Sequence, residues 1–191
     1  MDKNLLKQIV IPAIKARETY EAAFTGLNEA EQYLVRLTYT GPDNKPEQLE
    51  TRIVFPIITE AEDMKLFFYH PRRLKDSSHD KVIETRFIGE AISRFPGKDG
   101  LYNIAVVYYD AKQGAAQYRF SVDNRKIDNW RANQGQTHRS WKFRHHREKP
   151  EPCVRIIRNV KLKNGSLIKL TGRKDFADPA IIDCIEITPQ L

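Results

Sequence analysis

Hydrophobic and polar side chains alternate through the middle of the chain, which is typical of strands that bury one face. In residues 101–110 one side carries Tyr102, Ile104, Val106 and Tyr108, and in residues 117–122 one side carries Tyr118, Phe120 and Val122. A polar loop ending at Gly114 separates these segments, so the pattern predicts an antiparallel pair of strands. Asp123 and Asn124 then favour a reversal into a third strand.

Short apolar segments separated by turn residues extend this pattern from Thr51 to the C-terminus. Asn164 and Gly165 form a strong hairpin-turn signal between two of the later segments. A sheet with one apolar face needs a second layer to cover it. The pattern therefore predicts a mostly β protein, with a β-sandwich or a jelly roll over residues 51–191.

The first part of the chain shows a helical spacing of apolar residues instead. In residues 3–24 these are Leu5, Leu6, Ile9, Val10, Ala13, Ile14, Ala16 and Tyr20, with Pro12 as a kink or break. Asn28 and Glu31 have the spacing of a capping box that would begin a second helix, although residues 33–39 also alternate well enough for a strand. We expect residues 1–50 to form a short α-helical appendage, as a linker to an upstream domain or its remnant.

Length and composition describe a globular domain with an appendage. The chain has 191 residues, of which 40% are hydrophobic and 30% charged, and this is enough to bury a core. No apolar run approaches the roughly 20 residues that a membrane helix needs, and the N-terminus lacks the pattern of a signal peptide. We expect a cytoplasmic protein if the chain is complete, and a secreted or periplasmic one if it belongs to a longer exported enzyme.

The two cysteines leave the redox compartment open. Cys153 and Cys184 lie in no spacing that suits a zinc site. They would pair if neighbouring strands brought them together, but the favoured interpretation is two small buried hydrophobic side chains.

The net charge of +7 is unevenly distributed along the chain. Residues 125–174 contain fifteen Lys and Arg residues against three acidic ones, Asp128, Glu148 and Glu151. A basic surface of this density favours polyanions such as nucleic acid or an acidic polysaccharide. The alternative is a set of well-solvated strand and loop charges, and the sequence leaves both open.

Four motifs follow one another along the β-rich part of the chain. Residues 59–64 contain Glu-Ala-Glu, residues 100–108 read Gly-Leu-Tyr followed by alternating apolar residues, residues 122–126 form a turn after a valine, and residues 182–187 carry Asp183 in an apolar strand. Together they resemble the motifs of carbohydrate-binding modules of families six and thirty-five, over about residues 52–189. The resemblance implies a β-sandwich jelly roll.

The acidic residues of these motifs indicate a metal site. Glu60 and Glu62 lie two residues apart, so on a strand they face the same side and repel each other unless a cation joins them. The resemblance implies that Asp183, on a last strand beside the first, completes a structural calcium site with them. Carboxylate and carbonyl oxygens are the ligands that Ca²⁺ takes. The alternative is a solvent-facing acid pair bridged by a nearby Lys or Arg.

Candidate sugar-binding residues gather in and beside a long basic loop. Modules of this kind stack aromatic residues on sugar rings, for which Trp130 and Trp141 are the candidates. The asparagine that often precedes the last-strand aspartate is replaced here by Ile181. Around Trp141 lie Arg139, Lys142 and Arg144, which suit an acidic sugar or single-stranded nucleic acid. Alternatively, each tryptophan covers one edge of the sandwich.

No motif for catalysis accompanies these residues: the sequence has no Gly-x-Ser-x-Gly elbow, phosphate-binding glycine loop or HExxH. We therefore expect a noncatalytic carbohydrate-binding module, the C-terminal accessory domain of a glycan-degrading enzyme, whose partners are a polysaccharide or oligosaccharide and an upstream catalytic domain. Two alternatives remain. One is an accessory sandwich that packs on a parent protein without binding glycan, and the other is a polyanion-binding or nucleic-acid-binding protein that uses residues 125–174.

Overall fold

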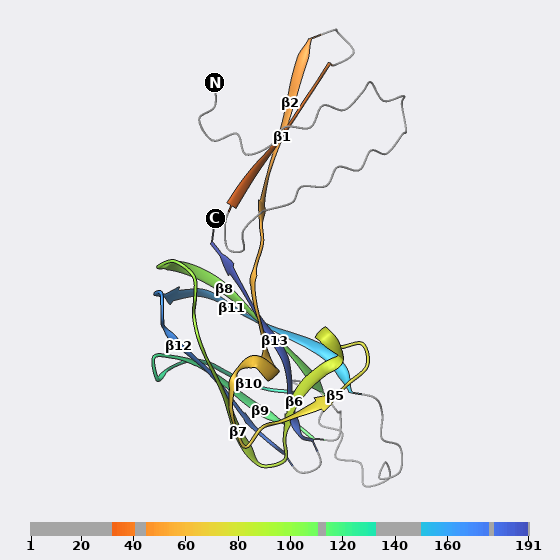
Figure 1. The fold of residues 1–191 in the computed structure, drawn as a ribbon, viewed down its shortest axis with the longest axis vertical. Helices are drawn as coiled ribbons and strands as arrows, with labels where there is room; N and C mark the ends of the chain where they lie inside the picture. The colour runs from red at the N-terminus through yellow and green to blue at the C-terminus, as the bar shows by residue number, and fades with distance from the viewer. Residues whose placement is uncertain (1–31, 41–44, 111–113, 133–149, 176–177, 191) are drawn as a thin grey trace.

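The computed structural model describes residues 32–40, 45–110, 114–132, 150–175 and 178–190. Over these ranges the chain is built from antiparallel strands, with two single-turn 3₁₀ helices, η1 (Ala61–Asp63) and η2 (Ser78–Asp80). None of the helices in the described ranges is long and apolar enough to cross a membrane. The two sheets of the main body lie face to face, and a separate hairpin extends away from them (Figure 1).

The first sheet of the sandwich has five strands in the spatial order β10-β9-β12-β7-β4. Their bounds are β4 Lys65–Phe67, β7 Ile88–Arg94, β9 Gln117–Val122, β10 Arg125–Arg131 and β12 Leu167–Arg173. The turn between β9 and β10 is tight because Asp123 and Asn124 both adopt positive φ, 48° and 63°, which is the conformation of a two-residue hairpin loop. The predicted reversal at these residues is confirmed.

The second sheet has the order β11-β8-β13-β6-β5, and β3 also pairs with β13. Its strands are β3 Ile57–Glu60, β5 His70–Arg73, β6 Lys81–Thr85, β8 Gly100–Asp110, β11 Glu151–Leu162 and β13 Ala180–Pro189. β11 bends where its register with β8 shifts between Ile157 and Val160, next to Asn159 at φ 60°. β13 therefore lies in the middle of this sheet, between the early strands and β8.

The core lies between the two sheets, as the alternating pattern predicts. Tyr102, Ile104, Val106 and Tyr108 of β8 are all buried, and so are Tyr118, Phe120 and Val122 of β9. Aromatic rings contact one another within and across the layers: Tyr118 of β9 stacks on Trp130 of the neighbouring strand β10, with centroids 5.3 Å apart, and its ring lies 5.0 Å from that of Tyr108 in the other sheet. Pairs of this kind stabilise a core beyond the area that they bury.

Two predicted strand pairings are wrong. β8 and β9 do not pair with each other, because β8 belongs to the second sheet and β9 to the first. Likewise, Asn164 and Gly165 form a turn, with Gly165 at φ 80°, but it links β11 to β12 across the sandwich and makes no hairpin. Strands that face one core from opposite sheets show the same one-sided burial as neighbours in a single sheet, so alternation alone does not distinguish them.

The described part of residues 1–50 is not helical, which corrects the expectation that the second helix, begun at the capping box of Asn28 and Glu31, would continue through it. Here β1 (Gln32–Thr40) pairs with β2 (Pro46–Val54) in full antiparallel register. The strand alternative for residues 33–39 is therefore confirmed, because their period-two alternation matches a strand. The helix expected over residues 3–24 lies outside the described residues.

Neither Cys153 nor Cys184 forms a disulfide bond in the described part of the chain. Cys184 is buried and Cys153 is partly buried. β8 separates them, since Cys153 pairs with Tyr108 and Cys184 pairs with Val107 on the other side of the same strand. The interpretation of Cys184 as a small buried hydrophobic residue fits this placement, and a disulfide between the two does not.

Candidate functional site

Three carboxylates meet where the first strand of the sandwich lies against the last. β3 pairs antiparallel with β13, and Glu60 at the end of β3 is opposite Cys184, the neighbour of Asp183. Glu62 follows within η1, a single 3₁₀ turn. The premise that Glu60 and Glu62 share one face of a strand is therefore wrong, yet the turn still brings their carboxylates within 4.8 Å of each other.

The loop before β6 closes over these carboxylates. The backbone N–H of Ser78 lies 3.2 Å from both side-chain oxygens of Asp183, and the Ser78 hydroxyl donates to Glu60 Oε1 at 2.7 Å. His79 Nδ1 lies 3.4 Å from the same Glu60 oxygen. His79 and Asp80 reach these positions with positive φ, 50° and 54°. Neither Ser78 nor His79 stands out in the sequence, because residues 70–80 have the composition of an ordinary polar loop.

Burial and the nearby carboxylates make the ionised form of Asp183 unfavourable. Asp183 is buried, and desolvation together with the nearby Glu60 and Glu62 raises its pKa from 3.8 to about 6, although the Ser78 N–H opposes this rise. Burial, followed by the same carboxylates, also raises the pKa of the neighbouring Cys184 thiol to about 12. A cation placed among these oxygens would remove the repulsion that both shifts reflect.

Two carboxylate oxygens in this cluster have no hydrogen-bond partner among the described residues. Glu60 Oε2 and Glu62 Oε2 are both buried and unpaired, although Glu60 Oε1 is well satisfied. Buried acceptors of this kind are costly unless a donor or a metal ion meets them. Glu60, Glu62 and His79 each offer one ligand atom within 4.8 Å of the others, so these three residues could hold a metal ion. The two glutamates supply the carboxylate oxygens that a hard cation such as Ca²⁺ takes. His79 is 72% exposed in its side chain and lies at the rim.

The candidate sugar-binding residues fall into two groups. Trp130 is 3% exposed and belongs to the core cluster, where its ring stacks on Tyr118. Trp141, Arg139, Lys142 and Arg144 lie outside the described residues. Ile181, in the position where an asparagine was expected, is fully buried. Of the predicted sugar-binding residues, only the four in the long loop therefore keep that role as a prediction.

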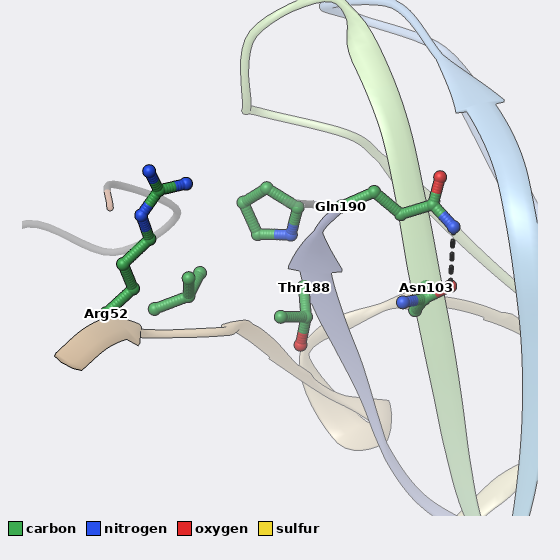
Figure 2. A pocket seen from close by; sticks show the side chains of 6 residues that line it. Arg52, Asn103, Thr188 and Gln190 are labelled. Carbon is green, nitrogen blue, oxygen red and sulfur yellow. Dashed lines mark hydrogen bonds between the residues drawn. The ribbon is translucent and has the colours of Figure 1, made fainter. Parts of the chain in front are cut away.

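A pocket of about 560 Å³ lies at the base of the hairpin, far from the carboxylates. Its lining is Arg52, Val54, Asn103, Thr188, Pro189 and Gln190. Figure 2 shows Gln190 pointing at Asn103, to which its amide donates at 3.3 Å, with Arg52 facing them from the hairpin. Arg52 offers a charged donor and Thr188 a hydroxyl, so the pocket suits a small polar or anionic group.

The basic window of residues 125–174 is partly neutralised in its described part. Arg155 makes two contacts with the Asp128 carboxylate, at 2.8 and 3.3 Å, and this joins β11 of one sheet to β10 of the other. Lys169 lies 3.5 Å from Glu90 on the neighbouring strand. Eight exposed cations of the described window remain on the strands or directly after them, Arg125, Lys126, Arg131, Arg158, Lys161, Lys163, Arg173 and Lys174.

The sandwich superposes on solved structures of carbohydrate-binding modules. The family 36 module of a multidomain xylanase from the hindgut metagenome of Trinervitermes trinervoides matches with a TM-score of 0.53 and 12% identity, over 71% of this chain and 98% of that module. A family 35 module from Clostridium thermocellum gives 0.52 and 10% identity, over 71% and 98%. The chain has the β-sandwich fold of carbohydrate-binding modules. The predicted resemblance is confirmed at the level of this fold.

A third structure shows this module fold inside a larger enzyme. In the β-(1,4)-mannanase of Podospora anserina, which joins a family 26 hydrolase to a family 35 module, the match covers 71% of this chain and 28% of that one, with a TM-score of 0.52 and 14% identity. In that enzyme, the fold shared with this chain therefore accounts for a minor share of the polypeptide.

Curated relatives by sequence are α-glucuronidases. A probable α-glucuronidase A from Aspergillus clavatus is 28% identical over 137 residues, which is 69% of this chain and 16% of that protein. The α-glucuronidase of Hypocrea jecorina is 26% identical over 155 residues, or 80% and 18%. The chain thus spans less than a fifth of the length of these relatives. No family model matches the chain.

Proposed function

We propose that this chain is a noncatalytic carbohydrate-binding module that serves as an accessory domain of a glycan-degrading enzyme. The observation that carries the proposal is the superposition of the sandwich on nearly the whole length of two such modules. The sequence relatives support the enzymatic context, since the chain matches only a small share of each α-glucuronidase. The upstream partner would be a catalytic domain of that kind.

The finer fold that we propose is a jelly roll held by a structural calcium ion. The pairing of β3 with β13 supports it, because it brings the two ends of the sandwich together. The ligands would be Glu60, Glu62 and Asp183. Calcium would satisfy Glu60 Oε2 and Glu62 Oε2, and it would offset the burial and the repulsion by Glu60 and Glu62 that together raise the pKa of Asp183.

The glycan site that we propose uses Trp141, Arg139, Lys142 and Arg144. A tryptophan supplies a flat apolar surface for a sugar ring, and guanidinium groups form paired hydrogen bonds to a carboxylate. The ligand would therefore be an oligosaccharide or polysaccharide that carries acidic sugars. Because Trp130 is buried in the core, ring stacking falls to Trp141.

Affinity gel electrophoresis of the full chain tests this function. The gels contain glucuronoxylan, neutral xylan or neither, each at low and high salt, with single-stranded DNA binding measured in parallel. We expect retardation by glucuronoxylan that survives high salt, because stacking is insensitive to salt whereas ion pairing is screened. Trp141→Ala should abolish it. Arg158→Gln, an exposed cation on β11, is the matched control and should leave it intact.

Each other outcome favours an alternative. DNA binding that is lost steeply with salt, with no glycan retardation, would indicate a polyanion-binding protein. No binding in any gel would indicate an accessory sandwich that only packs on its parent protein. A Trp141→Ala variant that binds glycan as well as the original chain would place the sugar site elsewhere.

A further inference from the structure

The hairpin formed by β1 and β2 has one apolar face that no described residue covers. The register pairs Tyr33 with Ile53, Val35 with Thr51, Leu37 with Leu49 and Tyr39 with Glu47, and these side chains share one face. On it Leu37, Tyr39, Leu49 and Ile53 are 46%, 45%, 61% and 40% exposed. The opposite face is mostly polar, and there Arg36 pairs with Glu50 at 2.7 Å.

A hairpin of this kind needs a second layer. Two strands alone are marginally stable in water, and apolar patches of this kind mark a contact surface. Figure 1 shows β1 and β2 extending away from the sandwich, so the core between the two sheets does not bury them. One contact ties the hairpin base to the following chain, an edge-to-face pair of Tyr33 and Phe55 at 6.0 Å.

We propose that the segment formed by residues 3–24 covers this apolar face. The segment ends only a few residues before Gln32, the first residue of β1, so a short connection joins it to the hairpin. Its apolar residues recur at helical spacing and include Leu6, Val10, Ala13 and Tyr20. A helix of this length measures about 33 Å, and the nine residues of β1 extend about 30 Å.

The size of the face favours a segment of the same chain over a second copy. One face of a two-stranded ribbon this long offers on the order of 300 Å², whereas a stable dimer buries about 800 Å² on each partner. A tethered segment needs much less contact area, because its local concentration is high and no translational freedom is lost on docking. The hairpin and residues 3–24 would together form a small two-layer unit beside the sandwich.

Cysteine crosslinking in the full chain tests this proposal. Cys153→Ala and Cys184→Ala remove the native thiols, and Val10→Cys is combined with Leu49→Cys on the apolar face or with its neighbour Glu50→Cys on the polar face. Both hairpin positions are exposed and equally distant along the chain. With a short bis-maleimide we expect the Leu49→Cys pair to crosslink within one chain about ten-fold faster than the Glu50→Cys pair.

Equal crosslinking on both faces would overturn the proposal, because a freely moving segment reaches either side. Crosslinks mainly between two chains would overturn it in favour of a second copy. As an independent measurement, Leu37→Asp should reduce the difference between the faces, while Thr38→Asp on the polar face should not. Deletion of residues 1–24 should increase the fluorescence of an apolar dye several-fold, and an unchanged signal would also contradict docking.

Discussion

The ionisation of Asp183 links the carboxylate cluster to the stability of the fold. Its pKa is raised from 3.8 to about 6, mainly by burial, so the folded state holds a proton that the unfolded chain releases. The stabilisation is complete below about pH 4 and is lost as the pH rises to about 6. The loss is on the order of 3 kcal/mol for a shift of this size.

We therefore expect the metal-free protein, in EDTA, to become less stable between pH 4 and pH 6.5. Asp183→Asn keeps an acceptor for the Ser78 N–H and removes the charge, so this variant should lose that part of the pH dependence. At pH 7 without metal it should be more stable than the original chain by roughly 1–3 kcal/mol. Urea unfolding at several pH values measures this. If the free energy of unfolding depends on pH in the same way for both proteins, the prediction is wrong and ionisation of Asp183 does not destabilise the fold.

At neutral pH, bound calcium should stabilise the folded protein. A saturating ion stabilises the folded state by about 2.7 kcal/mol at a concentration one hundred times its dissociation constant, which raises Tm by roughly 5–10 °C. Glu60→Gln and Glu62→Gln should each abolish the rise, because each removes a ligand charge. Asp63→Asn is the control, since Asp63 is an exposed acid in the same 3₁₀ turn. An equal rise in all four proteins would place calcium elsewhere.

Substitution of His79 distinguishes a calcium site from a site for metals that prefer nitrogen ligands. Its ring lies within reach of Glu60 and Glu62, and imidazole is a good ligand for Zn²⁺ but a poor one for Ca²⁺. We expect His79→Ala to keep the calcium-induced rise in Tm, measured by differential scanning fluorimetry. If the variant instead loses a zinc-induced rise and the original chain shows no response to calcium, the cluster is a zinc site.

At the scale of single elements, two glycines on paired strands make room for one tyrosine ring. Gly89 of β7 lies opposite Gly172 of β12. A Cβ atom at Gly172 would lie 1.8 Å from the Tyr69 hydroxyl oxygen, and one at Gly89 would lie 2.5 Å from the Tyr69 ring. Tyr69 is buried, and its hydroxyl has no hydrogen-bond partner among the described residues. The ring therefore packs directly on the backbone of both strands.

This packing predicts opposite effects for two substitutions. Gly172→Ala should destabilise the fold by at least about 2–3 kcal/mol, because the ring has to move within a dense core. Tyr69→Phe should be neutral or stabilising, since it removes an unpaired buried hydroxyl. In a double-mutant cycle by urea unfolding, Tyr69→Phe should recover part of the Gly172→Ala loss. Additive effects would show that the hydroxyl is not what the new methyl group meets.

The sequence predicted the strands better than it predicted their partners. The alternate residues from Tyr102 to Tyr108 and from Tyr118 to Val122 are buried as the pattern indicates. This prediction succeeds because burial with a period of two residues is a local property of the sequence. The pairing of β9 with β12 and of β8 with β13 is a long-range property that no short pattern encodes. The carboxylates were found through a motif, whereas Ser78 and His79 act through backbone conformation and contacts from a loop that looks ordinary.

At the scale of the whole molecule, every buried residue of the described chain lies at Ile57 or later. In the hairpin, residues 33–39 of β1 and 46–54 of β2 have exposed or half-buried side chains only. The solved modules likewise superpose on about 70% of this chain and on almost all of themselves. Among the described residues, the sandwich therefore holds the core, and the hairpin contributes no buried residue to it.

A chain that begins at Phe55 should consequently fold by itself and keep the carboxylate cluster. We expect a single cooperative urea transition, with a denaturant slope that reflects the buried core. Its calcium-induced rise in Tm should match that of the full chain, because Glu60, Glu62 and Asp183 are all retained. A broad transition, or the loss of the calcium response alone, would show that the hairpin supports the sandwich. In that case the proposed boundary near residue 51 would not separate two units, and contacts such as Tyr33 with Phe55 would be part of one cooperative fold.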